Sequence, residues 1–253
     1  MQPKELKLLK TKKGRNEAGL FIIEGEKFVN EIPADWQVVQ YVFAQRYARE
    51  NDISNFPMKY DIMRDSIFDS LADTVSPQGV LAVCKQKQYK LEDIPHNFIL
   101  LGENLNDPGN IGALIRTAAA AGASGVILTT GDIYNPKVLR ASAGAVLRLP
   151  IVTDVSLNQV FEYLKDTPTY AAHPRGDVLP YQLDLSKNFC LMVGNEAHGL
   201  TETAANMATG LVTLPMVNNT ESLNASVAGS VLMYEAVRQR IGKLGGVSNA
   251  ASS

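Results

Sequence analysis

The sequence predicts an α/β protein in which a small N-terminal domain precedes a larger domain with a parallel sheet. The main signal is in residues 98–129, where an apolar strand-like run, a helix of small apolar residues and a second apolar run follow one another. Such a succession over roughly 30 residues is a βαβ unit, and its two strands lie parallel. The polar stretch Lys85–Lys90 interrupts the apolar pattern and predicts a linker between the two domains.

In the N-terminal part, short elements of both kinds alternate. Apolar runs that predict strands occur at Leu20–Ile23, Val38–Ala44 and Gly79–Cys84. One helix is expected to begin near Glu26, and Asp65 is expected to cap another that runs through Leu71. Together these elements predict a small α/β domain within residues 1–90.

The second part, residues 97–243, has more apolar strands and clearer helix boundaries. Asp107 and Pro108 predict a helix start, because an N-cap carboxylate is followed by proline at the first helical position. Ser156 and Gln159 form a capping box for a second helix. Strands are expected at Phe98–Leu101, Gly125–Thr129, Thr169–Ala172, Phe189–Val193 and Gly210–Leu214, and a last helix over Ser226–Arg240.

Composition is that of an ordinary soluble protein, with 45% apolar and 20% charged residues. No apolar run reaches the roughly 18 residues of a membrane span, and the N-terminus lacks a secretory core, so we expect a cytoplasmic protein. Cys84 and Cys190 lie in apolar strand-like runs without the spacing of a metal site. We therefore expect buried free thiols and no metal. Residues 244–253 predict a disordered tail.

The net charge of −2 does not by itself indicate a nucleic-acid partner, but the first fifteen residues are strongly basic. They contain one acid, Glu5, and six basic residues, which are Lys4, Lys7, Lys10, Lys12, Lys13 and Arg15. Two interpretations remain open: a segment that contacts RNA phosphates, or the solvated face of an N-terminal helix.

Three segments place polar residues and glycines directly after apolar strands, which is where open parallel sheets bind ligands. In the first, Asn104–Ala118, Gly109 and Gly112 permit close backbone approach beside a helix N-terminus. Arg116 is the single charge in a run of small apolar residues, and we expect it to be buried against a phosphate or carboxylate. A structural salt bridge is the alternative.

The second segment, Leu191–Leu200, runs from a strand into Gly194, Glu196 and Gly199. Such a turn exposes backbone N–H groups and one acid, or it is merely a tight strand-to-helix connection. In the third segment, Leu214–Gly229, a strand ends in a polar loop rich in asparagine. A helix N-cap explains one residue of that loop but not the whole polar cluster.

Taken in order, these segments resemble the three signature motifs of the SpoU (TrmH-like) family within the SPOUT methyltransferases. The residues that match are Asn110, Gly112 and Arg116, then Gly194, Glu196 and Gly199, then Pro215, Met216, Ser222, Leu223 and Asn224. The family often has a glycine after the Pro-Met pair, where this chain has Val217, Asn218 and Asn219. Asparagine adopts the left-handed conformation most readily after glycine. Upstream, Phe21–Gly25 and Ser76–Val80 resemble the L30e-like RNA-binding domain found in many members.

The resemblance implies a fold and an activity. The fold is a parallel sheet whose C-terminal part forms a trefoil knot, an exception to unknotted topology, preceded by the L30e-like domain. The activity is methyl transfer from S-adenosylmethionine to a ribose 2′-hydroxyl of structured RNA, with ribosomal RNA favoured over transfer RNA and DNA excluded. Two subunits are expected to form a homodimer in which each site borrows residues from its neighbour.

Three alternatives remain. A non-catalytic RNA-binding homologue would keep the fold but lose the chemistry. Other nucleotide-cofactor chemistry is disfavoured because GxGxxG and P-loop signatures are missing. Methylation of a base is disfavoured by the Ser222–Asn224 motif, which the resemblance associates with ribose.

The resemblance also assigns site residues. The catalytic group is Arg116, Glu196, Asn224 and Asn110. Because a guanidinium keeps its proton far above neutral pH, we expect Arg116 to orient the ribose and adjacent phosphate rather than act as a base. The cofactor-binding residues are Leu191, Gly194, Asn195, Gly199, Leu214, Met216, Ser222 and Leu223. The expected RNA-binding residues lie in the basic N-terminal segment, at Lys10, Lys12, Lys13 and Arg15, and near the catalytic face, at Arg140 and Arg148. Arg140 precedes Ala141–Gly144, which resembles the family's substrate-side segment.

Overall fold

The computed structural model describes residues 1–243, apart from residues 55, 57–58 and 219–221. The expected tail, residues 244–253, lies outside this range. The chain forms two compact units. The first combines Met1–Gln88 with Asp132–Arg148, and the second combines Tyr89–Gly131 with the chain from Leu149 onward. No helix among the described residues is long and apolar enough to cross a membrane.

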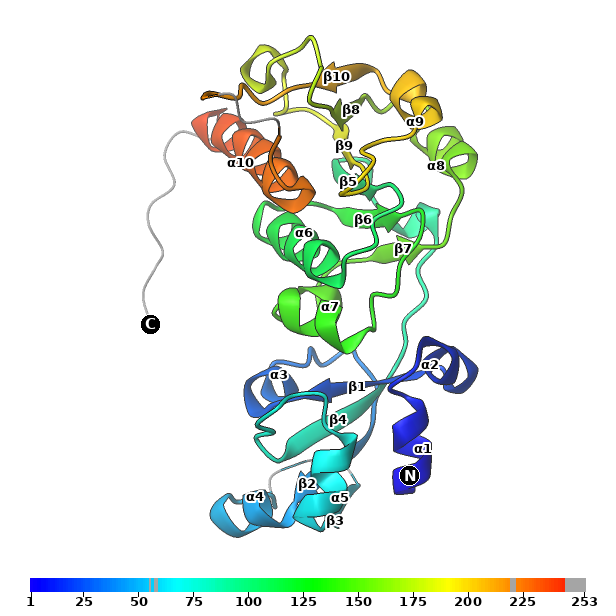
Figure 1. Ribbon diagram of the computed structural model, residues 1–253, viewed down its shortest axis with the longest axis vertical. Coiled ribbons are helices and arrows are strands. Elements are labelled where there is room, and N and C mark those ends of the chain that lie inside the picture. Colours follow the sequence, from blue (N-terminus) through cyan, green and yellow to red (C-terminus); the bar gives the residue numbers. More distant parts are fainter. Residues whose placement is uncertain (55, 57–58, 219–221, 244–253) are drawn as a thin grey trace. The chain divides into compact units, whose positions relative to one another are not determined.

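The first unit contains a four-stranded mixed sheet in the order β1-β4-β2-β3 (Figure 1). Its strands are β1 (Leu20–Glu24), β2 (Val38–Ala44), β3 (Tyr60–Met63) and β4 (Val80–Lys85). Its helices are α1 (Pro3–Leu8), α2 (Lys12–Ala18), α3 (Glu26–Asn30), α4 (Gln45–Glu50), α5 (Asp65–Leu71) and α7 (Pro136–Ala141). The three predicted strands are confirmed. The edge strand β3 was not predicted, since Tyr60 and Ile62 are exposed and give no buried apolar stripe.

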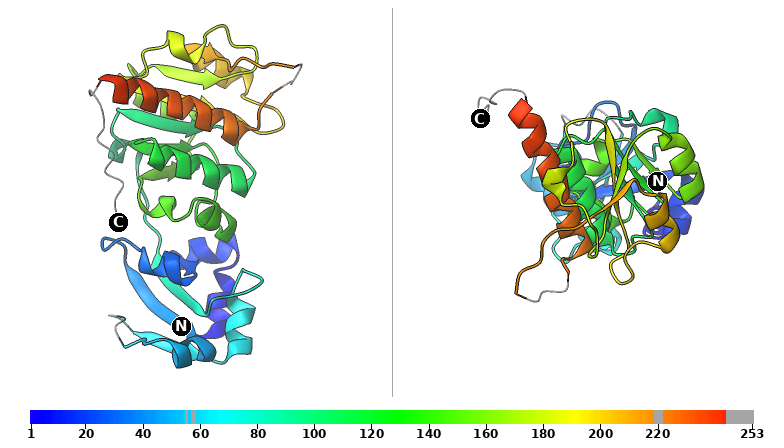
Figure 2. Two further views of the ribbon diagram at one scale, coloured as in Figure 1. Left: turned by 90° about the vertical axis from the view of Figure 1, so that its left-hand side faces the viewer. Right: turned by 90° about the horizontal axis from the view of Figure 1, so that it is seen from above.

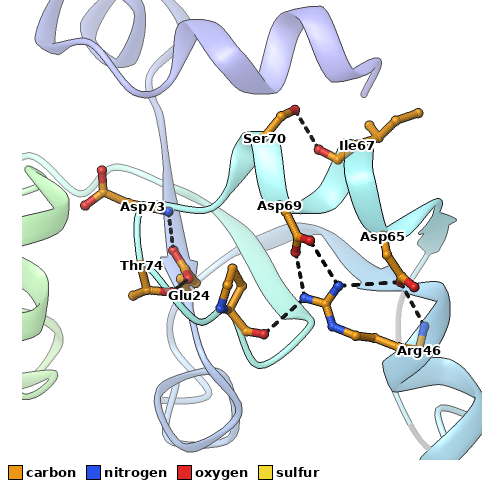
Figure 3. Close-up of polar contacts among 9 residues, drawn as sticks. Glu24, Arg46, Asp65, Ile67, Asp69, Ser70, Asp73 and Thr74 are labelled. Carbon is orange, nitrogen blue, oxygen red and sulfur yellow. Dashed lines mark hydrogen bonds and ion pairs between the residues drawn. The ribbon is translucent and has the colours of Figure 1, made fainter.

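Asp65 begins α5 as expected, but its role as the cap is wrong. The N-cap position is Arg64, and the Asp65 carboxylate instead accepts a hydrogen bond of 2.9 Å from the Arg46 backbone N–H. The Arg46 side chain forms a bidentate contact with Asp69 at 2.6 and 3.3 Å and donates to the Pro77 carbonyl at 3.1 Å (Figure 3). These contacts of Arg46 link the loop before β4 to the helices α4 and α5.

The segment Asp132–Arg148 follows a strand of the second unit in sequence but packs within the first. The Trp36 indole N–H donates to the Leu147 carbonyl at 2.8 Å. The Tyr134 ring lies 4.3 Å, centroid to centroid, from Phe21. Its hydroxyl also donates to the Lys87 carbonyl at 2.8 Å. These contacts are buried or half-buried, so the segment completes the core of the first unit.

The second unit contains a six-stranded sheet in the order β10-β8-β9-β5-β6-β7. Its strands are β5 (Phe98–Gly102), β6 (Gly125–Leu128), β7 (Ile151–Thr153), β8 (Thr169–Ala172), β9 (Phe189–Val193) and β10 (Gly210–Val212). Every strand pair is parallel, which confirms the predicted parallel sheet. Strands β5, β6 and β7 follow one another toward one edge of the sheet, and β8, β9 and β10 all lie on the other side of β5. The strand order therefore reverses between β5 and β9. Ligands bind at such a reversal, outside the carboxyl ends of the strands.

Helices cover both faces of this sheet. The helices are α6 (Pro108–Ala120), α8 (Leu157–Leu164), α9 (Glu202–Met207) and α10 (Ala225–Lys243). Helices α6 and α10 pack side by side on one face (Figure 1 and Figure 2), and residues of α8 and α9 join the core on the other. The predicted caps are confirmed: Asp107 accepts from the Asn110 N–H at 2.8 Å, and Ser156 and Gln159 form the capping box.

Both cysteines are free and buried, as predicted. Burial raises the pKa of the Cys84 thiol to about 12 and raises that of Cys190 as well. Both thiols are therefore protonated at neutral pH, which makes them poor nucleophiles.

Candidate active site

A cavity of about 330 Å³ lies at the carboxyl ends of β8, β9 and β10. This volume is in the range of small-molecule sites. Its lining is mainly backbone and apolar side chains, including Leu200, Val212, Leu214, Leu223 and Leu232. Among the described lining residues, Glu196 is the one acid and Arg175 the one arginine.

The turn after β9 forms one wall of the cavity. The backbones of Asn195 and Gly199 exchange two hydrogen bonds, of 3.0 and 2.9 Å. Gly199 has a φ of 69°, a left-handed conformation that favours glycine. The Asn195 side chain accepts from the Ala197 and His198 N–H groups and donates to the Asn104 carbonyl at 2.8 Å. The turn is therefore rigid and holds Glu196 at its exposed tip.

Glu196 meets α6 and the start of α10 in one hydrogen-bond network. Its Oε1 accepts from the Asn110 side-chain amide at 3.0 Å and from the Asp107 backbone N–H at 3.3 Å. The Asn110 Oδ1 in turn accepts from the Asn224 amide at 3.1 Å and from the Ser226 hydroxyl at 3.0 Å. Asn110 thus contacts both Glu196 and Asn224, so three of the four residues expected to be catalytic, one from each motif, belong to one network.

Ser226 belongs to this network but was not predicted. It is 8% exposed, and its hydroxyl, whose single proton is shared between two acceptors, also lies 2.6 Å from the Asn224 Oδ1. The Asn224 Oδ1 accepts from the Ser226 backbone N–H at 2.9 Å, so it satisfies a helix-terminal donor of α10. Asn224 therefore caps α10 and also belongs to the hydrogen-bond network of the site. The Asn-x-Ser spacing at a helix start is the sequence signal that would have found Ser226.

Arg116 lies apart from this network, and the expectation that it is buried is wrong. Its side chain is exposed on α6, while the neighbouring Ile115 and Ala118 face the core. Within the described part of the chain, the Arg116 side chain makes no hydrogen bond or ion pair. The helix turns the arginine away from the core because α6 buries only one face.

Most of the expected cofactor residues line the cavity. They are Gly194, Asn195, Gly199, Leu214, Met216, Ser222 and Leu223. Leu191 does not, because it is 3% exposed within β9 and pairs there with Leu100 and Tyr170. Asn218 has a φ of 60°, so asparagine adopts the left-handed conformation in the loop where the family often has glycine. Asn219 lies outside the described residues.

The expected RNA-binding residues lie in the first unit. Lys10, Lys12 and Lys13 are exposed. The expectation for Arg15 is wrong: it is 2% exposed, pairs with Asp132 and donates to the Leu9 carbonyl at 2.8 Å.

The two arginines near the substrate-side segment are already partly neutralised. Arg140 pairs with Asp73 at 2.6 Å, and Arg148 pairs with Glu31 at 3.1 Å. Both are on the surface, where such ion pairs are weak and exchange readily with other anions. Another anion can therefore replace Asp73 or Glu31 at a small cost.

Comparison with known proteins identifies the family of this chain. Residues 97–234 match the SpoU rRNA Methylase family, and residues 2–82 match the MRM3-like substrate binding domain. The chain is 32% identical to the 23S rRNA (guanosine(2553)-2′-O)-methyltransferase RlmP of Bacillus subtilis, over 91% of this chain and 94% of that protein. It is 29% identical to the 23S rRNA (uridine(2479)-2′-O)-methyltransferase of Streptomyces viridochromogenes, over 92% and 88%.

Solved structures of rRNA methyltransferases are similar to this chain over almost its whole length. The SpoU methyltransferase AviRb of Streptomyces viridochromogenes in complex with AdoMet has a TM-score of 0.85 at 27% identity, over 94% of this chain and 97% of that one. An AdoMet-bound rRNA methyltransferase from Sinorhizobium meliloti has a TM-score of 0.82 at 28% identity, over 93% and 94%. The protein therefore belongs to the SpoU rRNA methylase family, and an MRM3-like substrate-binding domain precedes its methylase domain.

Proposed function

We propose that this protein transfers a methyl group from S-adenosylmethionine to a ribose 2′-hydroxyl of ribosomal RNA. The observation that carries the proposal is the network of Asn110, Glu196 and Asn224, in which Glu196 also lines a cavity of cofactor size. The named activities of the two curated relatives are of this class. An RNA-binding homologue without chemistry is the second candidate, but the intact network does not favour it.

The cavity fits S-adenosylmethionine by its chemistry. Its apolar lining residues suit an adenine ring, and a Cβ at Gly199 would meet nothing within 4 Å, so open space lies beside the backbone of this turn. When bound there, the cofactor supplies a methyl group on a sulfonium, which is already a good leaving group. The protein's own task is then to align the ribose hydroxyl with that methyl, and positioning of this kind contributes several kcal/mol, roughly 7–11 at best.

The ribose-side groups are held ready for this task. Glu196 presents a carboxylate fixed by Asn110 and by the backbone at Asp107, and Asn224 fixes Asn110 in turn. We assign these side chains to the target ribose and Arg116 to the ribose and adjacent phosphate. We also propose that the C-terminal part of the sheet is threaded as the family's trefoil knot.

The exposed face of α10 supports a homodimer. Val227, Val231, Tyr234 and Ile241 are 47%, 46%, 54% and 42% exposed, and their spacing puts them on one side of the helix. A contiguous exposed apolar surface of this kind marks an interaction site. Since α6 packs beside α10, a partner on this face would also lie near Arg116, and we infer that Arg116 serves the partner's site.

A double substitution on this stripe, Val231→Asp with Tyr234→Asp, is expected to convert the dimer into a monomer that still folds. The two carboxylates would each be desolvated in the interface, at several kcal/mol per ion. Light scattering after gel filtration measures the mass, and circular dichroism checks the fold. Val75→Asp is the control, because Val75 is fully exposed and belongs to the first unit, whereas α10 belongs to the second. A double variant that remains dimeric would exclude this face.

We propose that the first unit binds RNA through the lysines of α1, α2 and the turn between them, which are Lys4, Lys7, Lys10, Lys12 and Lys13. Charge reversal tests this better than truncation. Removing residues 1–88 would expose the apolar side of Asp132–Arg148, so a loss of activity would not be specific. Changing Lys12 and Lys13 to glutamate should weaken RNA binding and flatten its salt dependence while leaving S-adenosylmethionine binding intact.

The direct test of function uses tritiated S-adenosylmethionine with ribosomal and transfer RNA that lack the modification. We expect label in ribosomal RNA, recovered as a 2′-O-methylnucleoside after digestion. Label in a base, or in transfer RNA alone, would contradict the proposal. If no RNA is labelled, calorimetry with S-adenosylmethionine distinguishes a wrong substrate, which leaves binding intact, from a protein without this chemistry.

Gly194→Ala is expected to weaken S-adenosylmethionine binding by at least about 10-fold. A Cβ at this position would lie 2.4 Å from the Gly199 carbonyl carbon and 2.5 Å from the Leu200 nitrogen, so the backbone of the turn would have to move. Overpacking of this kind also costs about 1–3 kcal/mol of stability. Calorimetry and thermal unfolding measure the two effects. Gly210→Ala is the matched control, since its Cβ meets nothing nearer than a Tyr170 ring carbon at 3.8 Å.

A further inference from the structure

Arg175 is a cation in the wall of the cofactor cavity that neither the motifs nor the catalytic network uses. It belongs to the loop after β8 and is exposed. Within the described residues its side chain makes no hydrogen bond or ion pair. An arginine that lines a ligand cavity without a protein counter-charge is suited to an anionic group of the ligand.

The loop that carries Arg175 is fixed to the neighbouring strand β10. The Thr213 hydroxyl donates to the Pro174 carbonyl at 3.2 Å, and the Thr213 backbone N–H donates to the Val178 carbonyl at 3.0 Å. A Cβ on Gly176 would lie 2.5 Å from the Leu211 carbonyl oxygen, so only glycine permits this close approach.

The backbone at Arg175 itself is also fixed. Its N–H donates to the His173 Nδ1 at 3.1 Å, and the His173 N–H donates to the Val212 carbonyl at 2.9 Å. The base of the Arg175 side chain is therefore held in place before any ligand binds. Preorganisation of this kind lowers the entropy lost when a ligand is bound.

Resting on the proposed function, we propose that Arg175 binds the α-carboxylate of S-adenosylmethionine. The cofactor carries one anionic group, that carboxylate, and two cationic groups, the α-ammonium and the sulfonium. Among the described lining residues the cavity offers one acid, Glu196, and one arginine, Arg175. Arg175 would hold the carboxylate, while Glu196 is hydrogen-bonded within the ribose network.

The position of Arg175 favours the cofactor over an RNA phosphate as its partner. The acceptor and donor groups assigned to the ribose, on Asn110 and Asn224, come from α6 and the start of α10. Arg175 comes from the loop after β8, which is hydrogen-bonded to the chain at β10. Strand β10 is an edge strand, separated from β5 by β8 and β9. A phosphate next to the target ribose would be met by Arg116 instead.

The test is calorimetric and requires no RNA. Wild-type protein and Arg175→Ala are titrated with S-adenosylmethionine and with its decarboxylated analogue, S-adenosyl-3-methylthiopropylamine. Loss of the charge-assisted pair should weaken S-adenosylmethionine binding by about 10-fold, with part of the affinity kept by Arg175→Lys. Binding of the decarboxylated analogue should be the same in wild type and Arg175→Ala. Arg238→Ala, which removes an exposed arginine of α10 that pairs with Glu235, controls for net charge.

Each outcome decides the inference. Equal S-adenosylmethionine affinity in wild type and Arg175→Ala overturns it, as does an equal loss for both ligands, which would indicate a structural role. If the S-adenosylmethionine affinity is unchanged, a separate methylation assay that shows a higher KM for RNA would assign Arg175 to the substrate. Failure of the wild-type protein to bind S-adenosylmethionine at all would instead refute the proposed function.

Discussion

Replacing Arg116 by alanine is expected to slow methyl transfer by about 10²–10³-fold, the usual effect of removing one preorganised donor from a transition state. The fold should not change, because the side chain is exposed and makes no hydrogen bond or ion pair within the described residues. S-adenosylmethionine binding should not change either, because Arg116 does not line the cavity. The loss of rate is therefore expected to arise entirely in the complex with RNA.

Single-turnover transfer of tritiated methyl to ribosomal RNA measures this effect. Arg116→Lys keeps the charge but loses the planar donor fork, so its rate should lie between those of the wild type and the alanine variant. A near-normal rate for Arg116→Ala in a folded dimer would remove Arg116 from the mechanism.

Mixed dimers test whether Arg116 acts across the subunit interface. Arg116→Ala and Glu196→Ala are each expected to be inactive alone. If the arginine serves the partner's site, a dimer with one subunit of each kind contains one site with both residues intact. Random pairing of equal amounts should then restore about one quarter of the wild-type activity in a twofold-symmetric dimer. If both residues serve the same subunit, mixing restores none.

The parts of the fold that could be predicted are those determined by local sequence. Asp107 and Pro108 define the start of α6 through a cap that reaches only to Asn110. The apolar run Phe189–Val193 is buried on both faces and coincides with β9 residue for residue. The motif residues Asn110, Glu196 and Asn224 meet because parallel strands bring their carboxyl ends to one edge of the sheet.

The parts that could not be predicted depend on distant partners. The burial of Arg15 is invisible in a basic N-terminal run, since its counter-ion Asp132 lies 117 residues away. Arg116 shows the reverse error: small apolar neighbours indicated burial, but only one face of α6 packs against the core. The segment Asp132–Arg148 follows β6 along the chain, and no local pattern indicates that it packs in the first unit.

That segment leads to a large expected effect on stability. Asp132→Ala is expected to destabilise the first unit by about 3–5 kcal/mol, because it leaves the Arg15 guanidinium buried without a counter-charge. Arg15 is 2% exposed, and within the described residues its one other acceptor is the Leu9 carbonyl and its Nε has no hydrogen-bond partner. Urea unfolding followed by tryptophan fluorescence measures the effect in this unit alone. Trp36 is the single tryptophan of the chain, and it packs against Tyr134 of the same segment.

Two further variants separate the buried ion pair from a simple loss of charge. Glu17→Ala removes an acid that faces Lys13 at 3.8 Å on the exposed side of α2, and it should cost at most about 1 kcal/mol. Adding Arg15→Met to Asp132→Ala should recover most of the lost stability, because a long apolar side chain fills the same space with no charge to desolvate. The two substitutions are then strongly non-additive, as expected for groups in direct contact. If Asp132→Ala costs no more than Glu17→Ala, the pair does not hold the segment, and the aromatic contacts of Trp36 and Tyr134 must do so instead.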